Sequence, residues 1–274
     1  MSKDADYQRI RLAMVCLPAP EELDSDAIVA AYARRFPGDE PFELTGDGEA
    51  TLKELGIRDE GAQAVAGKLG ADTVLLHRID APIPWEDLEG PCEVAFDWDE
   101  AEPVLRAHEA HVVCVLIGGV DAEIERTLRL TRLVGAVAAG TQATAVYWGE
   151  APLVKSRAAF LEQSAQLSRA EPPIELWVGF QPSVEKVKGR ERFSVFTFGM
   201  APLGLMEIEV HGAERTERVE VIDLVAGIAR YLIDKGMVIS DGDTVGISPQ
   251  FKILARYVDS AWDREGPVLL LEVP

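Results

Sequence analysis

The chain has 274 residues, and its 47 acidic residues outnumber its 27 lysines and arginines, so the formal charge at pH 7 is −20. This charge argues against a nucleic-acid-binding surface and against docking on an anionic membrane, because both need clustered basic side chains. Apolar residues make up 47% of the chain, which is enough to build a large core. The length fits one large domain or two ordinary ones.

The first residues are polar and mixed in charge, and no apolar run approaches the roughly 20 residues that cross a bilayer. We therefore expect neither a signal peptide nor a membrane-spanning helix. The three cysteines, Cys16, Cys92 and Cys114, are far apart in the sequence. An odd number of scattered cysteines is typical of reduced thiols in a cytoplasmic protein. The sequence thus predicts a cytoplasmic protein, and it contains no motif that calls for a cofactor.

The first 180 residues alternate strand-like and helix-like segments. Short apolar runs predict strands at 10–17, 42–45, 73–79, 111–118, 143–149 and 173–180. Helical spacing and capping residues predict helices at about 25–36, 61–69, 99–108 and 121–139, and one that starts at Ser156. The strand–helix–strand order over 111–149 indicates parallel pairing in part of a sheet. Three prolines interrupt 81–98, which is predicted to be a long ordered loop.

Residues 183–192 form the one locally basic stretch and are predicted to be an exposed loop or hairpin tip. We place there the boundary between an N-terminal region (1–182) and a C-terminal region (183–274). The C-terminal region reads β-β-α-β-β, with elements at 193–199, 205–210, 219–235, 252–258 and 267–273. The predicted fold class is therefore α+β (mixed α/β) with a mixed sheet, which either spans both regions or is divided between them.

The C-terminal region contains three specific runs, namely Thr197-Phe198-Gly199-Met200, Leu203-Gly204-Leu205-Met206-Glu207-Ile208-Glu209 and Ile239-Ser240-Asp241-Gly242-Asp243-Thr244. Over about residues 193–260 this pattern resembles bacterial proteins grouped as domain of unknown function 4261. Weaker similarity extends upstream to the PIPW segment (82–85), the strand entry at His108–His111 and Tyr147-Trp148-Gly149. That family has no established activity, so the resemblance implies a fold and a bacterial origin, but no reaction and no catalytic residues.

Several other patterns have a structural and a functional interpretation. Gly199 and Gly204 flank a connection between two strands, whereas a phosphate-binding loop leads from a strand into a helix. Glu207 and Glu209 share one face of a half-buried strand, and we expect solvent exposure rather than an active-site pair. Asp241-Gly242 is expected to form a hairpin turn rather than part of a calcium loop.

Two histidines, His108 and His111, are three residues apart. On a continuous helix this spacing presents two imidazole nitrogens to one metal ion. Here a helix is expected to end near His108 and a strand to begin at His111, so the side chains are expected to diverge. A metal- or small-ligand-binding enzyme that uses these histidines and nearby carboxylates is therefore the alternative function.

Carboxylates surround two tryptophans in the proline-interrupted segment, and the residues concerned are Trp85, Glu86, Asp87, Asp97, Trp98 and Asp99. A half-exposed tryptophan ringed by carboxylates is typical of a protein-binding hot spot. The alternatives are that the indoles only pin a loop, that a divalent cation binds an acidic cluster around Trp98, or that Asp99 caps a helix. That cluster consists of Glu93, Asp97, Asp99 and Glu100. We expect a non-enzymatic acidic interaction module, immunity- or antitoxin-like, whose partner is a basic protein such as a toxin.

Overall fold

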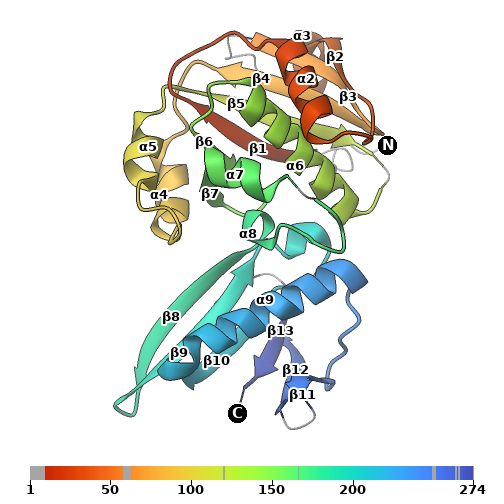
Figure 1. Cartoon of the computed structure of the whole chain (residues 1–274). Helices are drawn as coiled ribbons and strands as arrows, with labels where there is room; N and C mark the ends of the chain where they lie inside the picture. The colour runs from red at the N-terminus through yellow and green to blue at the C-terminus, as the bar shows by residue number, and fades with distance from the viewer. Residues whose placement is uncertain are drawn as a thin grey trace. The chain divides into compact units, whose positions relative to one another are not determined.

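The computed structural model describes residues 10–57, 63–119, 121–165, 167–248, 251–262, 264 and 266–273. Two compact units make up the chain, Met1–Leu167 and Ser168–Pro274, called here the first and second units (Figure 1). Each unit has its own sheet, and the second sheet is mixed, which confirms the predicted α+β class. None of the described helices combines the length and the apolarity needed to cross a membrane.

The sheet of the first unit has the strand order β2-β3-β4-β5-β1-β6-β7. Its strands are β1 (Ile10–Leu17), β2 (Phe42–Asp47), β3 (Gln63–Leu69), β4 (Asp72–Ile79), β5 (Ala110–Gly118), β6 (Ala145–Trp148) and β7 (Leu153–Ser156). The described neighbours all pair antiparallel. The prediction of parallel pairing over 111–149 is therefore wrong. β1 lies between β5 and β6 and pairs with both. The backbone groups through which β5 and β6 could have paired with each other are therefore hydrogen-bonded to β1 instead.

The helices of the first unit are α2 (Ser25–Arg35), α3 (Gly48–Leu55), α4 (Trp85–Glu93), α5 (Ala101–Ala107), α6 (Glu123–Gly140) and α7 (Arg157–Gln163). Helix α6 packs on β1 and β5 and against α2. Leu52 of α3 packs on Leu75 and Val115 of the sheet. Two predictions are wrong here. The described part of the segment predicted as a helix at 61–69 is strand β3, because β2 and β4 pair with it on both sides. The predicted loop at 81–98 contains α4.

The second unit has the strand order β11-β12-β13-β10-β9-β8, in which β10 and β13 are parallel. Its strands are β8 (Gly179–Val187), β9 (Arg190–Phe198), β10 (Ile208–Glu214), β11 (Thr244–Ser248), β12 (Phe251–Asp259) and β13 (Pro267–Glu272). Its helices are α8 (Ile174–Trp177), α9 (Arg218–Lys235) and the short turns η1 (Ala201–Leu203) and η2 (Arg215–Glu217). Helix α9 packs on β9 and β10. The segment predicted as a strand at 173–180 contains helix α8, and strand β8 begins only at Gly179.

The basic stretch 183–192 is the end of a β8–β9 hairpin. The two strands pair from Gly179 opposite Phe198 to Val187 opposite Arg190. Lys188 and Gly189, with φ of 50° and 81°, make the two-residue turn between them. Both strands belong to the second unit, so the division between the units falls at 167/168, before the expected 182/183 boundary.

Candidate functional site

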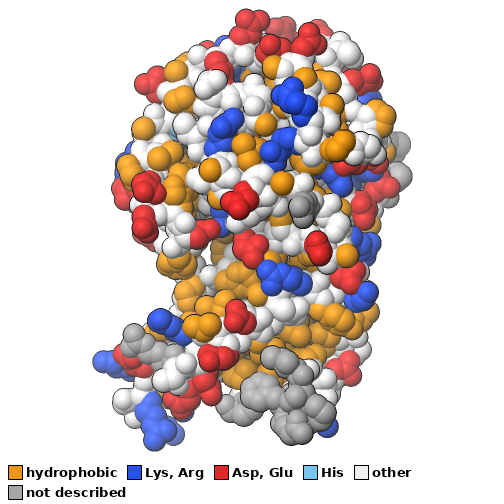
Figure 2. Space-filling view, in the orientation of Figure 1, with side chains coloured by type: hydrophobic (Ala, Val, Ile, Leu, Met, Phe, Trp, Pro, Cys, Tyr) orange, Lys and Arg blue, Asp and Glu red, His pale blue; other side chains and the backbone are white. Residues whose placement is uncertain are grey.

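The α4–α5 helix pair carries the six residues expected to bind a partner. Trp85, Glu86 and Asp87 form the first turn of α4, and Asp97, Trp98 and Asp99 lie in the connection to α5. The four carboxylates are exposed and the two indoles are half-buried. Acidic and hydrophobic side chains lie next to one another over α4 and α5, at the left margin of Figure 2. We call this region, with Glu89, Glu93, Phe96 and Glu102, the acidic–aromatic surface.

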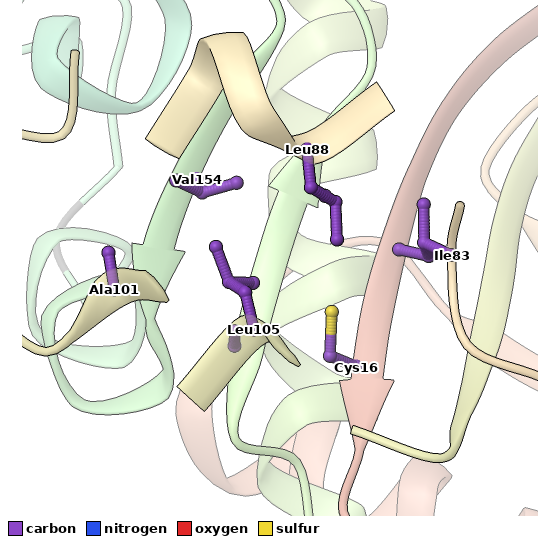
Figure 3. Packing of buried hydrophobic residues seen from close by; sticks show 7 residues of the cluster. Cys16, Ile83, Leu88, Ala101, Leu105 and Val154 are labelled. Atoms are coloured by element: carbon purple, nitrogen blue, oxygen red, sulfur yellow. The ribbon is translucent and has the colours of Figure 1, made fainter. Parts of the chain in front are cut away.

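Buried apolar side chains fix the two helices to the sheet. Leu88 of α4 and Leu105 of α5 are 0% and 1% exposed. They belong to a cluster whose other members are Cys16, Ile83, Ala101, Ala145 and Val154 (Figure 3). Trp85 and Trp98 pack on the margin of this cluster. The indoles therefore do pin the segment to the body of the unit, and they remain half-exposed as well.

A hollow of about 270 Å³ opens between α4 and α5. Trp85, Trp98, Cys92 and four carboxylates line it, and the one basic side chain among its described lining residues is Arg106. The guanidinium of Arg106 lies 3.7 Å from the centre of the Trp85 ring, and its Nε donates to Glu102 at 2.8 Å. The hollow thus offers an aromatic face and carboxylates to a guanidinium, a combination that favours cation–π binding.

Phe96 lies in the connection between α4 and α5 and is 69% exposed. The sequence analysis did not select it, although its position between Ala95 and Asp97 in an acidic segment was the available signal. The next residue, Asp97, pairs with Lys155 of β7 at 2.7 Å, which ties the loop to the sheet. A large exposed apolar ring on an anchored loop is the most unusual surface feature of the helix pair.

His108 and His111 act as hydrogen-bonding links between backbone segments. Helix α5 ends at Ala107 and β5 begins at Ala110, so His108 follows the helix and His111 lies in the strand, as expected from the sequence. His108 donates from Nδ1 to the Leu105 carbonyl, and its Nε2 accepts from the Ile83 N–H at 2.7 Å. His111 is 2.7 Å from the Ala81 carbonyl through Nδ1. In this geometry His108 has no free ring lone pair for a metal ion.

Glu209 on β10 is fully buried, which contradicts the expected solvent exposure. Its carboxylate accepts from Ser260 Oγ at 2.5 Å and from the Ala261 N–H at 3.4 Å, and it lies 2.8 Å from Nε2 of His211. Trp262 packs against the His211 ring, with centroids 4.9 Å apart. A buried carboxylate thus holds the beginning of the β12–β13 loop on the sheet.

Glu207 is half-buried, and its carboxylate is also engaged by the protein itself. Oε1 accepts from the N–H groups of Gly199, Met200 and Ala201 at 3.0–3.1 Å. Oε2 accepts from Thr197 Oγ1 at 2.7 Å. The chain's own carboxylate occupies the anion-binding concavity of the Gly199–Gly204 connection, so this connection is a tight turn, as expected.

Asp241 and Asp243 serve the turn after α9. Asp241 Oδ1 accepts from the Tyr257 N–H at 2.9 Å, and Asp243 Oδ2 accepts from the Ser240 N–H at 2.8 Å. These bonds support a turn at Asp241-Gly242, but the turn leads from α9 into β11 and is not the expected hairpin turn. No group of three or more His, Cys, Asp or Glu residues in the described parts of the chain is arranged to hold a metal ion.

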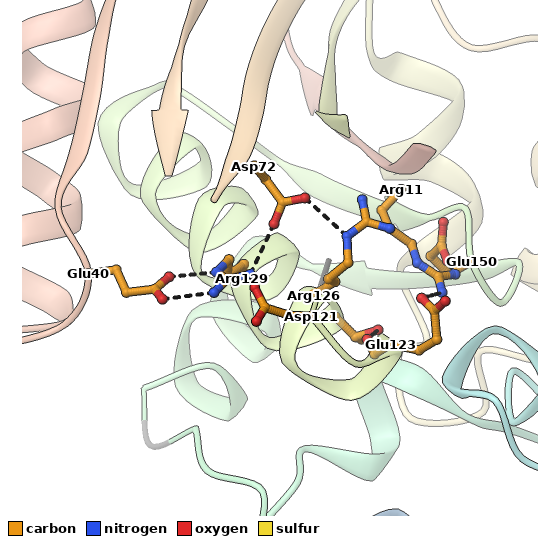
Figure 4. A network of polar contacts seen from close by, with 9 residues as sticks. Arg11, Glu40, Asp72, Asp121, Glu123, Arg126, Arg129 and Glu150 are labelled. Atoms are coloured by element: carbon orange, nitrogen blue, oxygen red, sulfur yellow. Dashed lines mark hydrogen bonds and ion pairs between the residues drawn. The ribbon is translucent and has the colours of Figure 1, made fainter. Parts of the chain in front are cut away.

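A buried ion-pair network joins α6 to β4, and the sequence analysis missed it (Figure 4). Asp72, 0% exposed, accepts from Arg126 Nε at 3.0 Å and from Arg129 Nη1 at 3.1 Å. Arg129 also binds Glu40, and this contact lowers the pKa of the Glu40 carboxyl. A Cβ at Gly119, which has φ +79°, would lie 2.6 Å from Asp72 Oδ1. The only sequence signal was the presence of arginines on a helix face that is otherwise apolar.

The fold and these surfaces define a two-unit α+β protein with an acidic–aromatic surface on its first unit. The family model described as Domain of unknown function (DUF4261) matches residues 196–272, which confirms the resemblance of the C-terminal region. The match covers β10 to β13 and includes Glu207, Glu209 and His211. No curated protein and no solved structure matches the chain.

Proposed function

We propose that this protein is a non-enzymatic interaction module that binds a basic protein through the acidic–aromatic surface. The observation that carries the proposal is the exposed ring of Phe96 in the loop between Glu93 and Trp98, two residues that line the hollow. Aromatic side chains are enriched in the cores of protein interfaces, where a few residues carry most of the binding energy. Exposure of an aromatic ring to water is unfavourable, and a partner that covers the ring removes this cost.

The charge around these rings selects the kind of partner. Residues 85–109 contain nine carboxylates and one basic residue, Arg106. Such a field accelerates encounters with a basic protein and disfavours acidic ones. Arg106 stacked on Trp85 is an internal example of the contact that a partner's arginine would make. An immunity- or antitoxin-like role fits this chemistry, with a basic toxin such as a nuclease as the partner.

The surface is also ready to bind without rearrangement. Leu88 and Leu105 pack both helices on the sheet, and the Asp97–Lys155 ion pair holds the connecting loop. A surface that is already ordered loses less conformational entropy on association than a flexible one. The binding energy of the aromatic residues is therefore not spent on ordering the segment.

The test is co-purification with the protein encoded by the adjacent gene, using wild type and Phe96→Ala combined with Asp99→Lys. A basic neighbour is expected to co-purify with wild type and to bind the variant at least about 30-fold more weakly. Because both side chains are exposed, the variant keeps its thermal stability.

The matched control is Val219→Ala, which removes an apolar side chain, 58% exposed, from α9. This control should bind like wild type. The proposal is refuted if no basic neighbour co-purifies, or if the Phe96 variant and the Val219 control retain it equally well.

A further inference from the structure

The second unit contains a hollow of about 350 Å³ beside the η1 turn. Its walls come from the connection between β9 and β10, from Met237 after α9, from the β12–β13 loop and from the start of β13. The residues that matter for the argument are Leu205, Met206, Glu207, Met237, Arg264 and Val268. Four of these are apolar, and methionine side chains adapt their shape to what they contact. The hollow is therefore mostly apolar, with two charged groups at its edge.

Of the two charged groups, Glu207 is committed to the protein. Three backbone N–H groups and the Thr197 hydroxyl donate to its carboxylate oxygens. These four donors stabilise the negative charge in place, in the way that a backbone concavity holds an anion. Glu207 thus fixes the shape of the turn and offers a ligand little.

The second charged group of the hollow is Arg264. Its Nη1 donates to the Thr197 carbonyl at 2.8 Å, and its guanidinium lies 4.3 Å from the centre of the Phe196 ring. Within the described residues no carboxylate forms an ion pair with it. A guanidinium carries five N–H donors in a planar fork that matches a carboxylate. In the described parts of the chain, only Nη1 of this guanidinium donates to a hydrogen-bond acceptor.

The loop that carries Arg264 is anchored at its beginning. Fully buried Glu209 accepts from Ser260 and Ala261, and Trp262 packs on Phe196 with centroids 4.5 Å apart. The Phe196 ring therefore contacts both Trp262 and Arg264. This arrangement holds the guanidinium in one place, as a binding site requires.

We propose that this hollow binds a small carboxylate with an apolar tail. The carboxylate pairs with the Arg264 guanidinium, and the tail lies between Met206 and Met237. The volume is at the lower end of the range for small-molecule pockets, which suits a short chain. This site lies in the second unit, inside the segment that matches the family model, and is independent of the proposed partner surface.

The experiment uses the full chain labelled with ¹³C at its methionine methyl groups and titrated with hexanoate. Saturable shifts are expected for Met206 and Met237, and none for Met14 in the first unit. Hexylammonium and hexanol, which have the same tail, are expected to bind at least about tenfold more weakly because they cannot pair with a guanidinium. Absence of shifts at about 10 mM hexanoate, or equal binding of hexanol, overturns the proposal.

Arg264→Gln is expected to weaken hexanoate binding roughly tenfold. The control is Arg256→Gln, which removes an exposed arginine from β12 that does not line the hollow. An equal loss in both variants means that net charge alone drives binding and overturns the proposal. Should Arg264→Gln unfold, the wild-type comparison of hexanoate with hexanol decides the question.

Discussion

Asp72 and Arg126 form a buried ion pair, with Oδ1 of the aspartate 3.0 Å from Nε of the arginine and side chains that are 0% and 3% exposed. The two residues are 54 positions apart and belong to β4 and α6. Arg129 shares the same carboxylate from the next turn of α6. Asp72 thus bridges two buried guanidinium groups and joins a helix to the sheet, while Arg129 is also paired with Glu40 and Asp121.

Replacing this carboxylate should be costly. Asp72→Asn leaves two buried guanidinium groups without their shared counter-charge, and we expect a loss of about 3 kcal/mol or more in the free energy of unfolding. Urea unfolding of the variant measures this loss. Glu102→Gln, which breaks an exposed pair with Arg106, should cost less than about 0.5 kcal/mol. Similar losses in both variants would contradict the assignment of Asp72 as the centre of the network.

Removing the charge of Glu209 should loosen the β12–β13 loop. In Glu209→Gln the amide replaces a carboxylate that accepts from Ser260, Ala261 and His211, so we expect a loss of about 2 kcal/mol in stability. Amide hydrogen exchange at Ala261 should accelerate more than that of residues in β12. Asp259→Asn, at an exposed neighbouring position, serves as the control and should change neither quantity. Unchanged exchange at Ala261 would show that Glu209 does not hold the loop.

His111 should make the protein less stable in mild acid. Burial lowers its pKa below the ordinary value of 6.5, so on acidification the unfolded chain takes up this proton before the folded chain does. Stability is therefore highest above pH 6.5 and falls as the pH drops below it. His111→Asn keeps a side-chain donor for the Ala81 carbonyl but does not titrate.

Urea midpoints at about pH 7.5 and pH 5.5 check this prediction. The drop between the two pH values should be smaller in His111→Asn than in wild type. An identical drop in the two proteins would remove His111 as a source of the acid sensitivity.

The three thiols should differ sharply in reactivity. Burial raises the pKa of Cys16 to about 12 and raises that of Cys114 as well, and both side chains are fully buried. Cys92 is partly exposed in the α4–α5 hollow. A thiol reagent should therefore modify only Cys92 in the folded protein and all three cysteines after unfolding. Cys92→Ala should leave the folded protein unreactive, and rapid modification of that variant would contradict the burial of the other two.

Several elements were predictable because their residues alone impose the pattern. Helix α9 follows from apolar residues at helical spacing, and β9, β10, β12 and β13 follow from short apolar runs between turns. Strand β3 and helix α4 were not predictable in this way. The alanines of β3 suit a helix, and pairing with two neighbouring strands overrides that preference. In α4, Pro84 precedes the first turn and only Pro91 lies inside the helix.

The candidate sites also differ in whether the sequence alone could identify them. Trp85 and Trp98 lie close to the carboxylates of one short segment, so local sequence was enough to select the surface around them. Arg264 and Met206 are 58 positions apart, and only the folding of the β12–β13 loop onto the sheet places both at one hollow. Phe96 lies in the same acidic segment, and only the fold shows that its side chain is exposed.

The sequence by itself determined the net charge of −20, the α+β class and the similarity of the C-terminal segment to a known family. Tertiary structure decided what individual carboxylates do. Asp72 and Glu209 are fully buried and hydrogen-bonded, whereas Asp87 and Asp99 remain exposed. The physical reason is that burying a carboxylate is unfavourable unless hydrogen-bond donors or cationic groups compensate its charge. Those groups belong to distant strands and helices, so their positions depend on the whole fold.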